Sequence, residues 1–339
     1  MPAILNWSRA MVLVVAALAG GGPAAHADAN FLGKTITIFI GYGVGGSYHF
    51  YAQLFAHHLG RFLPGQPAII VQSSPGAGGV RMLNEAAVKM RTDGTNLFIP
   101  PDTMVVTQLL QPAGLAYDAR KFRYIGTADQ QNTFWVVRRG PHSSLEGMRV
   151  GETFMGSSGK GSTGYMIPAL AAPLLGLKIK HVGGYNSSRE MILAMDKGEI
   201  DGTLQAWQVW KQSRPSWFEP NGFAVPVIQV GAVSDPDAPN TPLLRDLVAP
   251  NDKPLASLFD TIGTLGRSLA APAAVSEEDL AALRDGFKAM SADPEFIDEA
   301  KRTQLRLLPK SGDDLEAAIA DAFANSSPDV VRRAQALTQ

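Results

Sequence analysis

Residues 35–59, TITIFIGYGVGGSYHFYAQLFAHHL, decide the fold of this chain. They begin with six β-branched or aromatic residues, Thr35–Ile40, a composition typical of a buried strand. Four glycines follow, and apolar residues then recur at the helical period, with Ser47 expected to cap the helix. Because a glycine turn at a helix N-terminus presents backbone N–H groups and a partial positive charge, the stretch predicts an anion site.

The composition of the chain excludes several classes of protein. With 339 residues, 45% of them hydrophobic and 18% charged, the chain is globular and long enough for two domains. Its net charge of −1 argues against a nucleic-acid binder that neutralises phosphates. The chain contains no cysteine, which excludes disulfides, thiolate metal sites and cysteine nucleophiles.

The first 27 residues have the pattern of a cleaved export signal. Arg9 precedes an apolar run at 11–19 that is too short to span a bilayer. The sequence Ala25-His26-Ala27 is a small-x-small cleavage site, so we expect the mature chain to start at Asp28 and to reside in a bacterial periplasm. Soluble ATP or NAD chemistry is not expected there.

Strand and helix patterns alternate along the mature chain. The first hundred residues predict a β-α-β-α-β unit, and hence a parallel sheet covered on both faces. Further predicted strands lie at 124–127, 134–138, 149–154, 178–182, 200–204 and 225–230, and we expect a turn at 145–148. The glycine turn recurs at 156–164, GSSGKGSTG, before a helix that ends at Leu175, and the last hundred residues look helical. Two such turns across a cleft suit one small acid held from both sides.

Two glycine motifs resemble nucleotide-binding loops without satisfying them. Gly41-x-Gly43-x-x-Gly46 matches the dinucleotide fingerprint, but the second strand ends at Ser74 without the acid that would bind the ribose. GKGST at 159–163 fails the P-loop pattern because a glycine separates Lys160 from Ser162. We therefore expect no nucleotide cofactor. Lys160 either meets an anion or is solvated.

Other chemistry-bearing residues have simpler interpretations. No Gly-x-Ser-x-Gly elbow occurs, and no serine has a recognisable base partner. His57 and His58 have no acid or further histidine at ligand spacing, so a surface helix face is favoured over a metal site. Trp207 follows a predicted strand end and either lines a pocket or packs, whereas Trp210 and Trp217 are expected to pack.

Several motifs occur in a specific order: the strand and glycine turn at 38–46, PGAGG at 75–79, DGT at 93–95, GSSGKGS at 156–162, HVGGY at 181–185, KGEIDG at 197–202, AP at 271–272 and DPEF at 293–296. In this order and spacing the chain resembles the Bug family, the solute-binding receptors of tripartite tricarboxylate transporters, over residues 34–325. It departs from the family at His49, where an acid is common, and at Gln53, where arginine is usual.

The resemblance implies an α/β, type II periplasmic-binding-protein fold, in which two lobes of mixed sheets flanked by helices close like a Venus flytrap. Lobe 1 is expected at 28–130 and 236–339, and lobe 2 at 131–235. The resemblance further implies a small carboxylate ligand (a di- or tricarboxylate, amino acid or aromatic acid) and a monomer that serves the membrane permease subunits of such a transporter. No catalysis, cofactor, metal or nucleic acid is expected.

By position, the resemblance places the ligand on the two glycine turns and on Arg267 before the strand near 268. Trp207 is included for its position after a predicted strand end and not by the resemblance. The expected binding residues are Tyr42, Gly43, Val44, Gly45, Gly46, Ser47, Tyr48, Ser157, Ser158, Gly159, Lys160, Gly161, Ser162, Thr163, Trp207 and Arg267. One alternative is an extracytoplasmic sensory or partner-binding protein. A less favoured one is a hydrolase using Ser158 or Ser162, for which the sequence offers no base.

Overall fold

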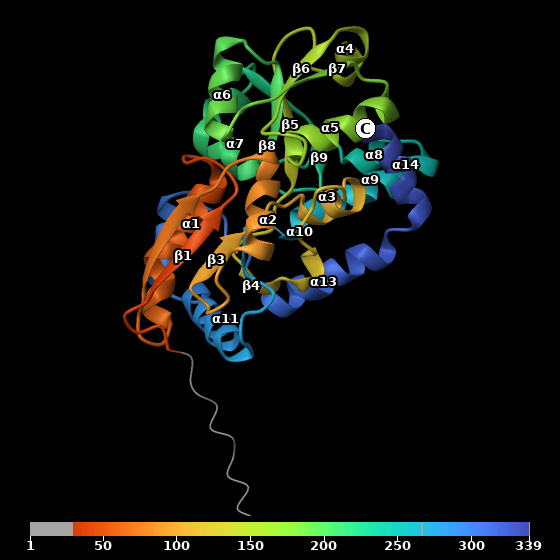
Figure 1. The fold of residues 1–339 in the computed structure, drawn as a ribbon. Coiled ribbons are helices and arrows are strands. Elements are labelled where there is room, and N and C mark those ends of the chain that lie inside the picture. The colour runs from red at the N-terminus through yellow and green to blue at the C-terminus, as the bar shows by residue number, and fades with distance from the viewer. Residues whose placement is uncertain (1–29, 266, 339) are drawn as a thin grey trace, which may run out of the picture.

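The computed structural model describes residues 30–265 and 267–338, which form two sheets, each packed against helices (Figure 1). The expected export signal lies outside these residues, so its cleavage near Ala27 stays a prediction. Within the described ranges, no helix is both long enough and apolar enough to cross a membrane.

The first sheet has six strands in the order β11-β4-β10-β3-β1-β2. Strands β1 (Thr35–Ile40), β2 (Ala68–Ser73) and β3 (Asn96–Ile99) are parallel, as the alternation of strands and helices predicts. Strand β10 (Ser268–Ala271) enters antiparallel between β3 and β4 (Arg123–Thr127). The short β11 (Lys310–Ser311) closes the edge beside β4. The sheet is therefore built from both ends of the chain.

The second sheet has five strands in the order β7-β6-β8-β5-β9. Their bounds are β5 (Thr133–Arg138), β6 (Thr153–Gly156), β7 (Ile179–Val182), β8 (Gly202–Ala206) and β9 (Ala224–Val230). The predicted turn at 145–148 and strand at 149–154 are partly wrong, because Leu145–Val150 forms helix α4. The Ser144 hydroxyl accepts a hydrogen bond from the backbone N–H of Gly147 and caps this helix.

Helices flank both sheets, and serine side chains cap some of them. Ser187 caps α6 by accepting from the N–H of Glu190, and Ser276 caps α11 by accepting from the N–H of Asp279. The longer helices are α1 (Ser47–His58), α2 (Val80–Val88), α3 (Met104–Leu110), α5 (Thr163–Leu175), α6 (Ser188–Lys197), α7 (Trp207–Ser213), α11 (Glu277–Ser291), α12 (Pro294–Arg302), α13 (Gly312–Asn325) and α14 (Pro328–Thr338); α8 (Leu244–Leu247), α9 (Lys253–Ser257) and α10 (Ile262–Leu265) are short.

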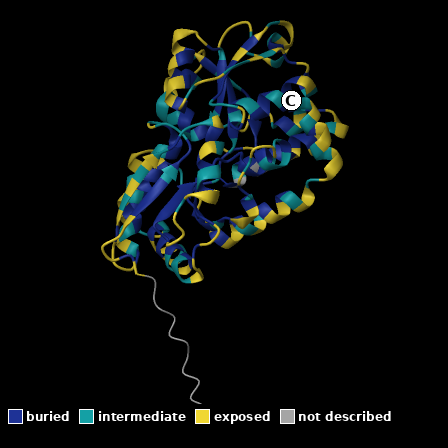
Figure 2. Cartoon of the chain, in the orientation of Figure 1, coloured by how far each residue is buried: buried dark blue, intermediate teal, exposed yellow. Residues whose placement is uncertain are grey.

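The cores lie between each sheet and its helices, where Figure 2 shows the strands buried and the outer helix faces exposed. In the first sheet, the alternate residues Ile36, Ile38 and Ile40 of β1 are fully buried against α1 and α11. Burial of apolar surface at about 25 cal/mol per Å² is what makes this strand the centre of the fold.

The C-terminal region is shared between the two sheets. Helices α11 and α13 pack on strand β4 of the first sheet. In contrast, Leu244, Leu255 and Ala334, from α8, α9 and α14, join Trp135 and Met166 in the core of the second sheet. The division into lobes at residues 130/131 and 235/236 stays a prediction, and α14 shows that the chain returns to the second sheet near its end.

A buried ion-pair network holds the segments that cross between the sheets. Asp129, in the five-residue connection from β4 to β5, is fully buried. The Arg306 Nε donates to Asp129 Oδ1 at 3.0 Å, and Arg306 Nη1 donates to Asp235 Oδ2 at 3.1 Å. The Tyr51 hydroxyl also lies 3.2 Å from Asp129 Oδ2. Arg306 thus ties the first crossing to the segment that follows β9.

Arg306→Ala should destabilise the folded protein by about 3–5 kcal/mol, because it leaves the buried Asp129 without its cation. The free energy of unfolding from urea titration checks this. Arg302→Ala, at an exposed position at the end of α12, is the control and should change it by less than about 0.5 kcal/mol. A similar loss of unfolding free energy in both variants would contradict the role of Arg306 as the cation that pairs with Asp129.

The stability should also depend on the titration of Asp129. Burial raises the pKa of Asp129 from 3.8 to about 6, against the opposing effect of Arg306. Between about pH 4 and about pH 6, Asp129 holds a proton in the folded chain that it has lost in the unfolded chain. The contribution of Asp129 to the free energy of unfolding therefore falls by up to about 3 kcal/mol as pH rises through this range. Asp129→Asn should flatten that part of the curve of unfolding free energy against pH, and an unchanged slope would refute the shift.

Candidate ligand-binding site

A small enclosed cavity lies between the two sheets, at the carboxyl ends of strands β3 and β8. Its volume is about 40 Å³, enough for roughly three water molecules. It is lined by Tyr42, Gly46, Ser47, Tyr48, Asp102, Thr133, Ser158, Ser162, Thr163, Gly164, Ser187, Ser188, Met191, Leu204, Gln205, Ala206 and Arg267. The two sides of the cleft are therefore closed on one another.

Three helices begin at this cavity, and two of them lack a side-chain cap. The first residues of α1, α5 and α6 all line it. Gly46, the N-cap of α1, has no side chain to accept a bond, and the Ser162 hydroxyl at the N-cap of α5 donates to the carbonyl of Gly159 instead. The first turns of α1 and α5 therefore meet the cavity without a side-chain cap, which is the arrangement that binds anions.

The prediction that Ser47 caps α1 is wrong, because its hydroxyl is used by Arg267. The Arg267 guanidinium donates to Ser47 Oγ from Nη2 at 2.8 Å and from Nε at 3.2 Å. It lies over the Tyr48 ring at 4.1 Å, and its Nη1 is 3.6 Å from Asp102 Oδ2. Arg267 is only 3% exposed, so the cavity contains a buried positive charge.

Asp102 and the two tyrosines set the polarity of the same wall. Burial raises the pKa of Asp102, and Arg267 opposes that shift. Burial also raises the pKa of Tyr48 and Tyr42, so both phenols stay protonated near neutral pH. The Tyr48 hydroxyl accepts from the backbone N–H of Asp102 at 3.0 Å, and Tyr42 donates to the carbonyl of Gly78 at 3.0 Å. These bonds fix the side chains around Arg267.

Backbone contacts latch the two sides of the cleft. The N–H of Gly43 donates to the carbonyl of Asn186 at 2.8 Å, and that of Gly78 donates to the carbonyl of Ser158 at 3.0 Å. The Thr103 hydroxyl donates to the carbonyl of Gly161 at 2.6 Å. The turn at 75–79 thus meets the second glycine turn directly, a role that its sequence alone does not reveal.

The structure brings half of the expected binding residues to the cavity. Its lining includes Tyr42, Gly46, Ser47, Tyr48, Ser158, Ser162, Thr163 and Arg267, and does not include Gly43, Val44, Gly45, Ser157, Gly159, Lys160, Gly161 and Trp207. Val44 is 65% exposed and Lys160 is exposed, which favours the solvated alternative for Lys160. Trp207 packs between Phe134 and Phe218, at ring distances of 4.6 and 4.8 Å.

Sequence reasoning missed part of the lining. Asp102 lies three residues after β3, where ligands of parallel sheets bind, so its position was a usable signal. Ser187 and Ser188, at the start of α6, also line the cavity. The family departure at His49 lies outside the lining; burial lowers the pKa of His49, and among the described residues its Nδ1 has no hydrogen-bond partner.

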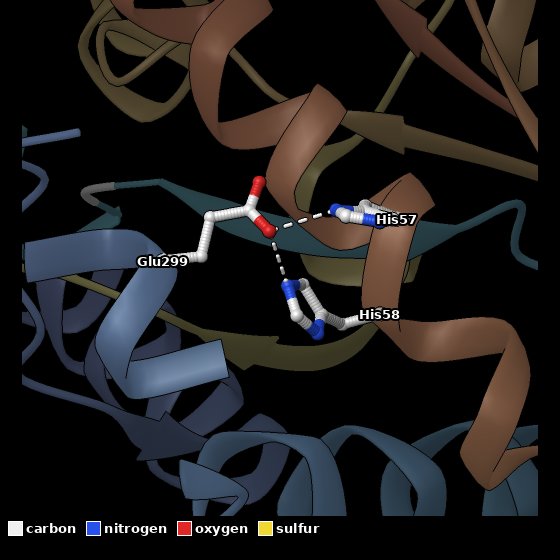
Figure 3. Close-up of side chains that lie close together, drawn as sticks. All are labelled: His57, His58 and Glu299. Atoms are coloured by element: carbon white, nitrogen blue, oxygen red, sulfur yellow. Dashed lines mark hydrogen bonds and ion pairs between the residues drawn. The ribbon is translucent and has the colours of Figure 1, made fainter. Parts of the chain in front are cut away.

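Of the two histidines on α1, His57 is exposed and His58 is buried. The prediction that both lie on a surface helix face is therefore wrong for His58. His58 is 3% exposed, and Figure 3 shows both rings turned toward Glu299 of α12. The distances to Glu299 Oε2 are 2.7 Å from His57 Nδ1 and 2.8 Å from His58 Nε2. The sequence could not show this acid, because it lies 241 residues from His58.

His57, His58 and Glu299 offer the nitrogen and oxygen atoms that zinc binds, but their hydrogen bonds indicate a structural role. Arg61 Nη2 lies 2.9 Å from His58 Nδ1, and arginine can only donate, so that nitrogen is the acceptor. The neutral ring then carries its proton on Nε2, the atom facing Glu299. A nitrogen that carries a proton cannot ligate a metal. The cluster therefore fastens α1 to α12.

No protein-family model matches this sequence. No curated protein matches it either. Solved structures resemble it in fold. They include the periplasmic binding protein BugD (15% identity, TM-score 0.67, covering 89% of this chain and 97% of that one). A second similar structure is MatC from Rhodopseudomonas palustris with bound malate, at 17% identity and a TM-score of 0.65, covering 90% of this chain and 99% of that one. A third is R. palustris Rpa4515 with adipate, at 18% identity and a TM-score of 0.69, covering 89% of this chain and 97% of that one.

These likenesses confirm the expected fold. The chain has the two-lobed α/β fold of periplasmic binding proteins, with one mixed sheet in each lobe. The cavity lies between the lobes, and the contacts of Gly43, Gly78 and Thr103 join one lobe to the other.

Gly161→Ala should favour an open arrangement of the lobes without unfolding either of them. A Cβ at this position would lie 2.7 Å from both the Ala77 carbonyl oxygen and Val80 Cγ2, across the cleft. Small-angle X-ray scattering should then give a larger radius of gyration than for the wild type. Gly183→Ala, whose Cβ would have nothing within 4 Å, is the matched control and should leave the radius unchanged. Equal radii for all three proteins would contradict the latch.

Proposed function

We propose that this protein is a periplasmic solute-binding protein of the Bug family that captures a small carboxylate by closure of its two lobes. The observation that carries this proposal is the buried Arg267 beside the uncapped N-termini of α1 and α5, all facing one closed cavity. Such a site is built to hold an anion. The similar structures with malate and adipate support a carboxylate as that anion.

Closure of the lobes is the proposed mechanism of capture. The contacts of Gly43, Gly78 and Thr103 join the lobes across the cavity, so the lobes must part before a solute enters. The carboxylate first meets Arg267 and the N-terminus of α1 on lobe 1. Closure adds the N-terminus of α5 and the contacts of Gly78 and Gly43, so the ligand stabilises the closed state by the donors that only this state provides.

The site supports binding better than catalysis. Among the lining residues, Asp102 is the acid, and it faces Arg267. The Ser162 hydroxyl donates to the Gly159 carbonyl and has no base to activate it. The proposed partners are the membrane permease subunits of a tripartite transporter, which would recognise the closed monomer after export and cleavage near Ala27.

Saturating concentrations of a cognate carboxylate should raise the melting temperature. At one hundred times Kd the ligand adds about 2.7 kcal/mol to the free energy of unfolding. Arg267→Lys keeps the charge but loses the fork that contacts Ser47, and should weaken binding about tenfold or more. Differential scanning fluorimetry and calorimetric titration measure both effects.

Arg245→Lys is the control for the arginine substitution. Arg245 pairs with Asp260 at 3.1 Å and does not line the cavity. The Arg245→Lys variant should therefore bind the carboxylate as tightly as the wild-type protein does. If mono-, di-, tricarboxylic and aromatic acids all leave the melting temperature unchanged, the proposed function is wrong.

A further inference from the structure

We propose that Asp102 selects the solute by requiring a hydroxyl or ammonium group beside its carboxylate. The proposal rests on the proposed function and names the ligand class more closely. One end of the solute is the carboxylate that Arg267 and the helix N-termini bind. The other group donates a hydrogen bond to Asp102, so a 2-hydroxy or 2-amino acid fits and an unsubstituted acid does not.

Asp102 is placed to accept from a ligand. It lines the cavity and is buried, and its backbone N–H is fixed to the Tyr48 hydroxyl at 3.0 Å. Its Oδ2 lies 3.6 Å from Arg267 Nη1, and Tyr48, Arg267 and the backbone N–H of Thr103 provide hydrogen bonds to its carboxylate. A carboxylate offers about four acceptor positions, so Asp102 retains room for one further donor.

The charges in the cavity decide which group can stand opposite Asp102. Arg267 and Asp102 compensate each other, and the remaining positive potential comes from the N-termini of α1, α5 and α6. A carboxylate of the solute is stabilised at those termini. A second anion placed against Asp102 would meet a like charge at a buried site of low dielectric constant, which is strongly unfavourable.

The spacing of Arg267 and Asp102 sets the distance between the two groups. Arg267 Nη1 and Asp102 Oδ2 lie 3.6 Å apart in one wall of the cavity. A carboxylate and a donor on adjacent carbon atoms can reach both residues at once. Donors farther along a chain would instead face Ser158, Thr163 or Gln205 on the other lobe.

Matched acids test the proposal on the mature wild-type protein. Calorimetric titration at pH 7.5 compares propionate with lactate and alanine, and succinate with malate and aspartate. Within at least one set the substituted acid should bind about tenfold or more tightly, the gain expected for a hydrogen bond to a buried charged group. Lactate against alanine, and malate against aspartate, distinguish the hydroxyl from the ammonium.

Asp102→Asn provides the second test, since it keeps the shape and removes the charge. It should reduce the preference for the substituted acid to within about threefold. Asp260→Asn is the matched control: Asp260 also pairs with an arginine but lies outside the cavity, so the preference should persist. Melting temperatures without ligand establish that both variants fold.

The results separate the two proposals. If the unsubstituted acids bind as tightly as their substituted partners to the wild-type protein, the selection by Asp102 is refuted while carboxylate binding stands. An unchanged preference in a folded Asp102→Asn variant refutes it as well. If none of the six acids and no longer acid binds, the proposed function itself fails.

Discussion

The burial of one guanidinium group organises the site of this protein. Removing a charge from water costs several kcal/mol unless it is paired and hydrogen-bonded. Arg267 meets this requirement with the Ser47 hydroxyl, the Tyr48 ring and the Asp102 carboxylate. These partners come from α1 and from the segment after β3, so the arginine fixes the ends of three chain segments around one cavity. The same contacts leave the first turn of α1 without a side-chain cap and open to an anion.

The site is also connected to the segments that cross between the lobes. The backbone N–H of Arg267 donates to the carbonyl of Asp129 at 3.2 Å, and the side chain of Asp129 accepts from Arg306. A second, partly buried arginine therefore supports the first through the crossing connection.

Local patterns predicted the framework well where each pattern was long enough. The bounds of β1 are as predicted, because a run of β-branched and aromatic residues before a glycine turn has few other solutions. The region at 145–154 was misassigned, because α4 has only six residues and its Ser144 cap gives a weak signal beside a neighbouring strand. Ser47 was misassigned for a different reason, since a distant arginine took the hydroxyl that a cap would use.

The sequence by itself determined the two glycine turns, the helices that follow them and the alternation that makes β1, β2 and β3 parallel, because these depend on neighbours within a few residues. Only the tertiary structure decided which turn residues face the cavity, how Arg267 meets Ser47 across 220 positions and how Glu299 reaches His58 across 241. Spacing along the chain carries no record of such pairs. They arise when burial of apolar surface packs distant segments together and each buried charge then requires a partner.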